Sequence, residues 1–483
     1  MGYTEKVAII GAGISGLACA YRLRQLGIPC LALEARGRAG GVIATIRRNG
    51  FLFEAGPQCP RFPPLLWRVV RELKLETDFV AGDAGAKRFI LRDGRLHAAP
   101  FSPAGLIGTR LVGLGSKLRI LTEVFGSSQP PLREESLADF VLRKFGVEVL
   151  DYLVDPFIST IFFGDAHKMG MESAFPALVE WERNRGSLVR GAIRARKTKG
   201  RMPGEDSSQQ KAGESRKRDT LHVTDALPSL GSFRSGMAAL PERLAADLHE
   251  EIRYSAAVAC VEAMPNVNGA PKAAWQIGLS TGEKITTQYL ILAVPAYVAA
   301  QLLASAAPQL ARQLKAVEYA PVCAVGSAYD RSQVANTLNG FGYMVPRREG
   351  LDTICTFWNS SLFPGRAPEG KVLMTSFAGR GTSNNAVAMG EEECARIVEA
   401  ENAIALGIKG PPLDRMVWKD PRALPQYNVG HAQRVAEIQE ILHPIPNLGI
   451  IGNFLKGRSI GDCVEVAFAA AQDVHSQIRG ENI

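Results

Sequence analysis

Three glycines near the start of the chain have the spacing of a dinucleotide-binding turn. Gly11, Gly13 and Gly16 form the pattern GxGxxG directly after the apolar run Val7–Ile10. The first glycine of such a turn makes the tight bend, the second lets a pyrophosphate approach the backbone, and the third lets a helix pack on the strand. The following helix would direct its positive N-terminal end at the phosphates. The pattern therefore predicts a nucleotide-binding site.

A carboxylate stands where the second strand of this unit should end. Apolar residues recur at near-helical spacing from Leu17 to Leu26, Gly27 is a plausible helix stop, and Cys30–Leu33 is typical of a second strand. Glu34 follows that strand, where an acid could accept hydrogen bonds from a ribose. This order favours a dinucleotide site over a chance glycine-rich turn, and leaves FAD and NAD open.

The composition is that of a folded protein with more than one domain. The 483 residues exceed the usual size of one core, 46% of them are hydrophobic and 22% charged, and mean hydropathy is near zero. The net charge of +8 would suit an anionic membrane or an acidic substrate, or solubility alone. We expect no nucleic-acid partner and, because the histidines are scattered, no metal site.

Several features bear on the compartment. None of the eight cysteines forms a CxxC pair, which favours a reduced compartment without a disulfide framework. The N-terminus lacks the pattern of a signal peptide. The most apolar window, Tyr289–Ala307, is interrupted by Pro295, Gln301 and Ser305, so we expect no transmembrane segment. These features predict a cytoplasmic protein, with peripheral attachment to the inner face of a membrane as an alternative.

Further apolar segments predict the rest of the organisation. Ile252–Val261, Tyr289–Val294 and Leu448–Ile451 are typical of strands, and a helix is expected from about Asp462 to Ile478. Ser102–Phe163 should be mostly helical. The apolar residues of that helical segment would form either core or a membrane-facing surface.

A polar stretch interrupts the centre of the chain. Arg194–His222 contains many charged and small polar residues and has no hydrophobic periodicity. We expect a disordered loop whose basic residues are solvated, with contact to an acidic partner as the alternative.

The residues after Glu34 favour FAD. Glu34–Gly41, with the letters EARGRAGG, resembles the extended fingerprint of the amine-oxidase and phytoene-desaturase flavoproteins. The paired glycines would bring the backbone close to the cofactor, and Arg36 and Arg38 could neutralise phosphate. Glu54–Pro57 also resembles the family segment that passes near the flavin, although Gly-Pro alone would indicate only a turn.

Other segments resemble protoporphyrinogen oxidases and the related coproporphyrinogen oxidases in particular. Gly452–Glu465 (GNFLKGRSIGDCVE), near the C-terminal end, resembles the closing motif of that family. Matching segments occur in the same order along the rest of the chain, outside the polar loop, at Gly56–Gln58, Arg88–Ile90, Phe163–Asp165, Ala174–Pro176, Gly186–Gly191, Ser232–Met237 and Pro425–His431.

This resemblance implies an α/β fold in which a Rossmann-like FAD-binding domain carries an inserted α+β substrate domain and a helical subdomain. The FAD-binding domain would comprise residues 1–86, 223–300 and 425–483. The substrate domain would comprise residues 87–101, 164–193 and 301–424. The helical subdomain, which could face a membrane, would span residues 102–163, and the disordered loop residues 194–222.

The resemblance also implies an activity, namely FAD-dependent oxidation of protoporphyrinogen IX or coproporphyrinogen III to the porphyrin in heme biosynthesis. Hydride would pass to flavin N5 and oxygen would be the acceptor, so no protein nucleophile is expected. The FAD would be bound non-covalently. Its contacts would come from Gly11, Ala12, Gly13, Ile14, Ser15, Gly16, Glu34, Ala35, Arg38, Gly41, Val42, Gly56, Pro57, Gln58, Cys59, Val258, Arg458, Ser459 and Ile460.

Three residues are implied for the substrate. Arg88 would bind a propionate, with a solvated surface arginine as an equal alternative, and Phe89 would lie against the ring unless it is simply core. Gly164 would let the macrocycle approach the backbone. The resemblance leaves the choice of porphyrinogen and the oligomeric state open, a homodimer being one option.

The sequence departs from this family at two positions, and other functions stay open. Val42 and Ala432 stand where bulky aromatic residues are common, which puts substrate details in doubt. The alternatives are another amine-oxidase-like flavoenzyme, such as an amine oxidase or a carotenoid desaturase, and a non-catalytic FAD-binding protein.

Overall fold

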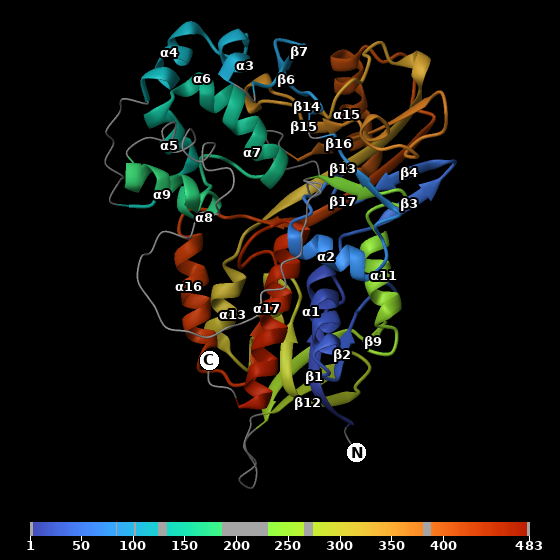
Figure 1. Cartoon of the computed structure of the whole chain (residues 1–483), viewed down its shortest axis with the longest axis vertical. Coiled ribbons are helices and arrows are strands. Elements are labelled where there is room, and N and C mark those ends of the chain that lie inside the picture. The colour runs from blue at the N-terminus through green and yellow to red at the C-terminus, as the bar shows by residue number, and fades with distance from the viewer. Residues whose placement is uncertain are drawn as a thin grey trace, which may run out of the picture.

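Two seven-stranded sheets and a lobe of helices organise the chain (Figure 1). The structure, a computed structural model, describes residues 3–83, 85–100, 103–123, 133–185, 230–264, 274–379 and 388–480. The predicted α/β fold with additional helices is confirmed. The predicted loop at 194–222 and the matching segment at 186–191 lie outside the described residues. The exact domain boundaries stay a prediction.

The first sheet has the parallel core expected of a nucleotide-binding fold. Its strand order is β10-β11-β12-β1-β2-β9, and β18 pairs with β12. The strands β18, β12, β1, β2 and β9 are paired in parallel, whereas β10 and β11 are antiparallel. The strands are β1 (Tyr3–Ile10), β2 (Cys30–Leu33), β9 (Ile252–Arg253), β10 (Val258–Met264), β11 (Ala274–Leu279), β12 (Lys284–Leu292) and β18 (Leu448–Ile450).

One predicted strand is wrong. Ile252–Val261 was expected to be continuous, but it contains the separate strands β9 and β10, which pair at opposite ends of the sheet. Ser255 between them has a φ of 53°, in the left-handed region that a strand cannot contain. The apolar pattern of the segment carries no sign of this bend.

Helices cover both faces of the first sheet. Val7 and Ile9 belong to one hydrophobic cluster and Ala8 and Ile10 to the other, because successive side chains of a strand point to opposite faces. On the Val7 face pack α1 (Ile14–Gln25), α2 (Pro64–Glu72), α11 (Ala239–Asp247) and α17 (Ile460–Arg479). On the other face pack α12 (Ala296–Leu302), α13 (Pro308–Lys315) and α16 (His431–Leu442).

The second sheet is mainly antiparallel and has the order β17-β13-β16-β15-β14-β6-β7. Its strands are β6 (Arg88–Arg92), β7 (Arg95–Ala98), β13 (Tyr319–Asp330), β14 (Gly342–Met344), β15 (Thr353–Phe357), β16 (Lys371–Ala378) and β17 (Asp414–Pro425). Associated with it are the helix α15 (Glu391–Leu406) and the short helices η3 (Arg331–Gln333), η4 (Arg347–Glu349) and α14 (Asn359–Leu362).

Two small strand pairs join this layer to the first. They are β3 (Thr45–Arg48) with β4 (Phe51–Glu54), and β5 (Phe79–Ala81) with β8 (Gly231–Phe233). A Cβ at Gly326 of β13 would lie 2.6 Å from the Phe53 ring, so the β3–β4 hairpin lies directly against the second sheet.

The third part is the helical lobe at the upper left of Figure 1. It contains α3 (Pro103–Gly108), α4 (Leu114–Thr122), α5 (Leu137–Lys144), α6 (Val147–Val149), the π-helix η2 (Leu150–Val154), α7 (Asp155–Phe162), α8 (Met171–Ala174) and α9 (Pro176–Arg185). The predicted helical character of Ser102–Phe163 is therefore confirmed where the structure describes it.

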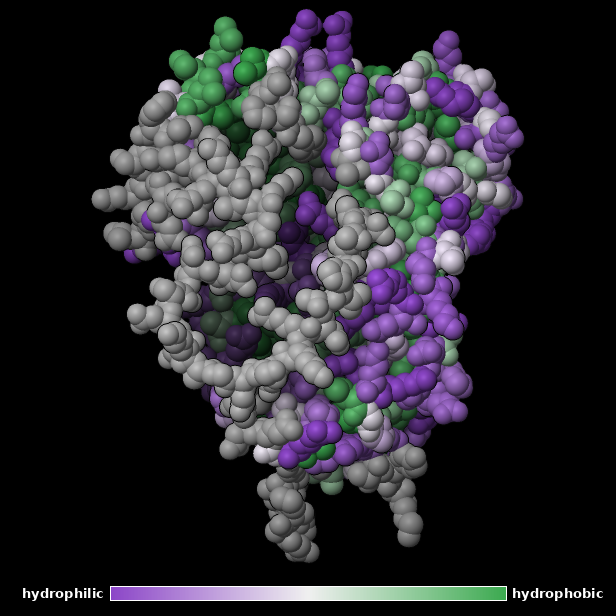
Figure 2. All heavy atoms as spheres, in the orientation of Figure 1, coloured by the Kyte–Doolittle hydropathy of each residue, from purple (hydrophilic) through white to green (hydrophobic). Residues whose placement is uncertain are grey.

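The apolar residues of this lobe divide into two sets. Leu111 and Val112 are buried, as in a core. Four others, on α3 and α4, are exposed to between 57% and 83%, namely Ile107, Leu114, Leu118 and Leu121. In Figure 2 hydrophobic side chains gather over this end of the lobe, at the top left. None of the helices within the described ranges is both long and apolar enough to span a membrane.

Candidate cofactor and substrate site

The glycine turn joins β1 to α1 as predicted. Gly11 has a φ of 103°, and a Cβ there would lie 2.7 Å from the carbonyl oxygen of Ala293. A Cβ at Gly16 would collide with the carbonyl oxygen of Gly11. Both glycines are therefore required by packing within the protein. At Gly13 the nearest atom to a Cβ would be the Gly41 Cα, 4.0 Å away, so the protein itself leaves room there.

Glu34 lies directly beside this turn. Its Oε2 accepts a hydrogen bond from the Ala12 amide and its Oε1 one from the Arg36 amide, both at 2.9 Å. The side chain is buried, and the backbone carbonyl of Glu34 accepts from Ala256, just before β10 begins at Val258. The structure thus brings Glu34, Ala35 and Val258 to the same edge of the sheet as the glycine turn.

The segment after Glu34 folds back onto the turn. The Gly40 amide donates to the Ala12 carbonyl at 2.8 Å, and Gly40 and Gly41 both have positive φ. Arg38 donates to the carbonyls of Gly41 at 2.9 Å and Ile43 at 3.3 Å. Arg38 therefore stabilises the loop that brings Gly41 against Gly13. Its charge also suits the predicted neutralisation of a phosphate.

The segment Gly56–Cys59 lies against Val42. A Cβ at Gly56 would lie 2.6 Å from the Val42 carbonyl oxygen, so this position requires a glycine. Gln58 is buried and donates to the Gly56 carbonyl at 2.9 Å, while its Oε1 accepts from Asn359 of α14 at 2.7 Å. The side chain of Val42 is 52% exposed, so its apolar surface is available to a ligand.

The N-terminus of α17 completes this arrangement. Ser459 and Asp462 form a reciprocal capping box, which fixes the first turn of the helix. Cys463 belongs to that turn, where burial raises the pKa of its thiol to about 11 and the nearby Ser15 hydroxyl opposes the change. Because Ser15 belongs to α1, the two helix N-termini are neighbours. Ile460 and Ile43 belong to the same hydrophobic cluster.

Arg458, just before α17, lies against the helical lobe. Its guanidinium carbon is 3.0 Å from the centre of the Phe162 ring of α7 and 5.6 Å from that of Tyr427. Burial lowers the pKa of Arg458 to about 10. The Tyr427 hydroxyl donates to the carbonyls of Asn453 at 2.6 Å and Gly457 at 3.2 Å. These contacts hold the loop before α17, and the sequence motif gave no indication of them.

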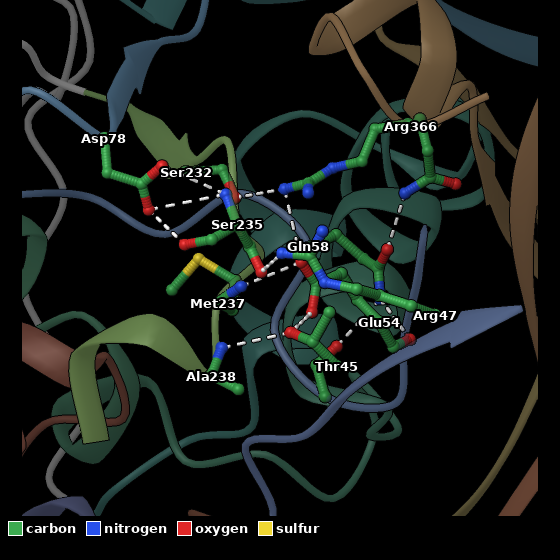
Figure 3. A network of polar contacts seen from close by, with 12 residues as sticks. Thr45, Arg47, Glu54, Gln58, Asp78, Ser232, Ser235, Met237, Ala238 and Arg366 are labelled. Carbon is green, nitrogen blue, oxygen red and sulfur yellow. Dashed lines mark hydrogen bonds and ion pairs between the residues drawn. The ribbon is translucent and has the colours of Figure 1, made fainter. Parts of the chain in front are cut away.

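A buried charge network surrounds Glu54, two residues before Gly56 in the sequence (Figure 3). Glu54 accepts hydrogen bonds from the Thr45 hydroxyl at 2.6 Å and the Met237 amide at 2.9 Å. Its Oε1 lies 3.2 Å from Nη2 of Arg366, which also donates to the Ser232 hydroxyl. Burial raises the pKa of Glu54 and the Arg366 charge opposes that rise. Through the contact between Glu54 and Arg366, the network connects the segment predicted to lie near the flavin, Glu54–Cys59, to the loop after α14.

The structure does not bring Arg88 and Phe89 together. They are consecutive on β6 and therefore point to opposite faces of the second sheet. Arg88 lies over the Phe341 ring at 4.5 Å, and burial lowers its pKa while the nearby Cys59 thiol opposes this. Phe89 packs against Trp358 in a hydrophobic cluster, with ring centres 5.5 Å apart. Arg88 is thus the member of the pair that faces the Gly56–Cys59 segment.

Gly164 has a close neighbour within the protein. A Cβ there would collide with Oε1 of Gln426, whose amide nitrogen donates to the Phe162 carbonyl at 3.0 Å. The need for a glycine at this position is therefore explained by Gln426 alone, without a macrocycle.

Comparison with known proteins decides the family. The chain matches the flavin containing amine oxidoreductase family over residues 14–475. It belongs to this family. Over 96% of its length it is 32% identical to the chloroplastic protoporphyrinogen oxidase of Nicotiana tabacum, covering 84% of that protein. Over 97% of its length it is 26% identical to the coproporphyrinogen III oxidase of Bacillus subtilis, covering 97% of that protein. The resemblance drawn from the motifs is confirmed.

Solved structures agree with the family fold. The crystal structure of a protein from Exiguobacterium sp. 255-15 has a TM-score of 0.79 at 23% identity, covering 98% of this chain and 99% of that one. Putrescine oxidase with putrescine bound has a TM-score of 0.66 at 16% identity, covering 98% and 99%. At these identities the likeness concerns the fold alone.

Membership in the amine oxidoreductase family makes the chain an FAD-dependent oxidoreductase, and its own residues fit that cofactor. Gly13 leaves space beside the start of α1, where a pyrophosphate would be attracted to the helix N-terminus. Glu34 is positioned beside the turn with carboxylate oxygens that can accept further hydrogen bonds. The capped N-terminus of α17 adds a second positive helix end nearby.

Proposed function

We propose that this protein oxidises a porphyrinogen, either protoporphyrinogen IX or coproporphyrinogen III, to the porphyrin, with oxygen as the final acceptor. The observation that carries the proposal is the similarity, over nearly the whole chain, to relatives named protoporphyrinogen oxidase and coproporphyrinogen III oxidase. Flavin-dependent oxidation by the family gives the reaction class. The proposed location is the cytoplasm, with peripheral attachment to the inner face of the membrane.

The proposed cofactor contacts are supported by the way the glycine turn, Glu34 and the segments near Val42, Gly56 and Ser459 come together in the structure. Gly11–Gly16 and Gly41 bind the pyrophosphate, while Glu34 and Val258 bind the adenosine. Val42, Gly56–Cys59 and Arg458–Ile460 surround the flavin ring. When bound, FAD supplies the hydride acceptor. The attachment is non-covalent, as in the resemblance drawn from the sequence, and Cys463 in the first turn of α17 is only 7% exposed.

Arg88 binds a propionate of the substrate. Its guanidinium is half-buried beside the Gly56–Cys59 segment, so an anion there meets a cation that is weakly screened by water. Phe341, which lies under the guanidinium, offers an aromatic wall for the tetrapyrrole on the same side. Phe89 supports this wall only indirectly, through its packing with Trp358. Gly164 contributes by leaving room for the side chain of Gln426.

Peripheral membrane contact is made by the end of the helical lobe. Leu114, Leu118 and Leu121 recur at i, i+4 and i+7, so they share one exposed face of α4. Ile107 of α3 is exposed nearby in sequence, and so is the basic residue Arg110. An apolar face with flanking positive charge suits an anionic lipid surface.

The first test is anaerobic mixing of the purified yellow protein with coproporphyrinogen III and, separately, with protoporphyrinogen IX. We expect bleaching of the flavin absorbance by one of them, followed by porphyrin fluorescence and peroxide once air is admitted. Failure of both to bleach the flavin would overturn the proposal. Bleaching by an amine or a carotenoid would instead assign one of the alternative activities.

The Arg88→Leu variant tests the substrate site. We expect KM for the preferred porphyrinogen to rise roughly tenfold or more, consistent with the loss of one charge-assisted hydrogen bond of about 1.5–3 kcal/mol. The matched control is Arg95→Leu on the neighbouring strand β7, whose side chain is exposed. Equal KM values for wild type and Arg88→Leu would remove Arg88 from the substrate site.

A further inference from the structure

Two buried thiols meet where α15 packs on the second sheet. Cys323 lies in β13 and Cys394 in the first turn of α15, and their Sγ atoms are 2.6 Å apart. The two side chains are 0% and 2% exposed. All eight cysteines are free, and neither Cys323 nor Cys394 belongs to the cofactor and substrate site described above. The two sulfurs are within reach of a disulfide bond.

The surroundings favour a thiolate on Cys394. Lys419 of β17 is directly opposite Cys323 in the strand register, and its positive charge acts to lower the pKa of both thiols. The hydrogen bond between the two thiols lowers the pKa of Cys394 and raises that of Cys323, while burial raises the pKa of both. Glu391 raises the pKa of Cys323, while Glu393 and Asp352 act in the same direction on Cys394. Cys394 also lies in the first turn of α15, where the positive end of the helix stabilises a thiolate, the reactive form of a cysteine, which makes Cys394 the nucleophile of the pair.

The helix that carries Cys394 is already fixed to the sheet at its other end. Asn402 of α15 accepts a hydrogen bond from the Tyr343 hydroxyl at 2.8 Å and donates to the Ser376 hydroxyl at 2.9 Å. Glu401 accepts from the amide of Thr353 at 2.8 Å. These contacts come from β14, β15 and β16, so a bond between the two sulfurs requires little movement of the helix (Figure 1).

We propose that Cys323 and Cys394 are a modification site, a thiol pair that hydrogen peroxide converts reversibly into a disulfide. The Cys394 thiolate attacks one peroxide oxygen, the O–O bond breaks, and the leaving hydroxide takes up a proton as water. The resulting sulfenic acid is attacked by Cys323, which forms the S–S bond and releases a second water. Two thiols are oxidised and one peroxide is reduced to two waters.

The disulfide has a structural consequence. It joins residues 71 positions apart and ties the first turn of α15 to β13. Cross-linking a loop of this length stabilises the folded state relative to the unfolded chain. The protein would therefore resist unfolding better under oxidising conditions. This inference does not depend on the proposed substrate, since any source of peroxide would suffice.

Differential alkylation of the flavin-loaded protein tests the pair. The reduced protein is treated with hydrogen peroxide, then denatured, alkylated with N-ethylmaleimide and analysed by peptide mass spectrometry. We expect the peptides that contain Cys323 and Cys394 to lose their alkylation together and to appear as one cross-linked species, which dithiothreitol separates again. The thermal unfolding midpoint should rise on oxidation and fall back on reduction.

Variants make the test specific. Cys394→Ser and Cys394→Ala should both abolish the cross-link and the rise of the midpoint, whereas Cys260→Ser, at an exposed cysteine, should keep both. Full alkylation of Cys323 and Cys394 after oxidation, or an equal rise of the midpoint in the Cys394 variants, would overturn the proposal. Because peroxide is added directly and no turnover is measured, this result is separate from that of the porphyrinogen assay.

Discussion

Glu54 and Arg366 form an ion pair that is excluded from water. Their Oε1 and Nη2 atoms are 3.2 Å apart, and each side chain is only 1% exposed. Thr45 and Met237 satisfy the carboxylate further, whereas Nε and Nη1 of Arg366 have no hydrogen-bond partner among the described residues. Each charge therefore depends on the other, and the pair stands two residues before Gly56 of the cofactor segment.

Removing one member of this pair should destabilise the protein more than removing both. Arg366→Met leaves a buried carboxylate without its counter-charge, which should cost about 3–5 kcal/mol of unfolding free energy. The double variant Glu54→Gln/Arg366→Met should recover much of that loss, because no buried charge is left. Urea unfolding of the single and double variants measures the coupling. Simple addition of the two single losses would contradict it.

Two neighbouring glycines should respond differently to the same substitution. Gly13→Ala should fold with nearly unchanged stability, since its Cβ meets only Gly41 at 4.0 Å, but it should lose FAD because the methyl group stands where the pyrophosphate approaches. Gly16→Ala should destabilise the apoprotein as well, because its Cβ collides with the Gly11 carbonyl. Thermal unfolding without FAD and flavin content after purification separate the two effects. Normal flavin content in Gly13→Ala would contradict the assignment.

The features that the sequence predicted well are local in the chain. The strand, turn, helix and second strand up to Glu34 lie within one short segment, and each requires a residue type that the pattern displays, such as the positive φ of Gly11. The helix at the C-terminal end was predicted from its apolar spacing in the same way. It begins at Ile460, two residues before the expected start, because Ser459 and Asp462 form the cap together.

The features that the sequence could not provide depend on distant residues. Nothing near Glu54 indicates that Arg366 is its partner, and nothing near Gly164 indicates that Gln426 fills the space above it. The motif Arg88–Ile90 places two candidate residues side by side, but only the strand assignment reveals that Arg88 and Phe89 face opposite ways. Such relationships arise from the packing of sheets and loops, which a local pattern does not encode.

His431 should make the folded state sensitive to moderate acid. The ring is 3% exposed and stacks on Tyr427 at 4.4 Å, and burial lowers its pKa from 6.5 to about 4. The pKa of His431 is therefore lower in the folded than in the unfolded protein. The neutral ring makes its full contribution to stability above the unfolded pKa, and this contribution is lost as the pH falls from there toward the folded pKa. Between pH 7 and pH 5 the loss should be about 2 kcal/mol.

Urea unfolding at the two pH values measures this loss. His431→Phe keeps a ring for the stack on Tyr427 but cannot be protonated, so its unfolding free energy should fall by about 2 kcal/mol less than that of the wild type over the same range. His443→Gln, at an exposed histidine, is the matched control and should behave as the wild type does. The same pH dependence in His431→Phe and wild type would assign the effect to other groups.

The exposed leucines of α4 should decide membrane binding. Burying the apolar face formed by Leu114, Leu118 and Leu121 in lipid should contribute several kcal/mol, since a fully buried leucine side chain is worth about 1.5–3 kcal/mol. The double variant Leu114→Glu/Leu118→Glu should therefore lose sedimentation with anionic vesicles while keeping its fold and flavin. Ile404→Glu, at an exposed residue of α15, is the matched control and should sediment as the wild type does. Equal sedimentation of the wild type and both variants would mean that the apolar face of α4 is not the membrane contact. Absence of sedimentation for the wild type would overturn the proposed membrane contact altogether.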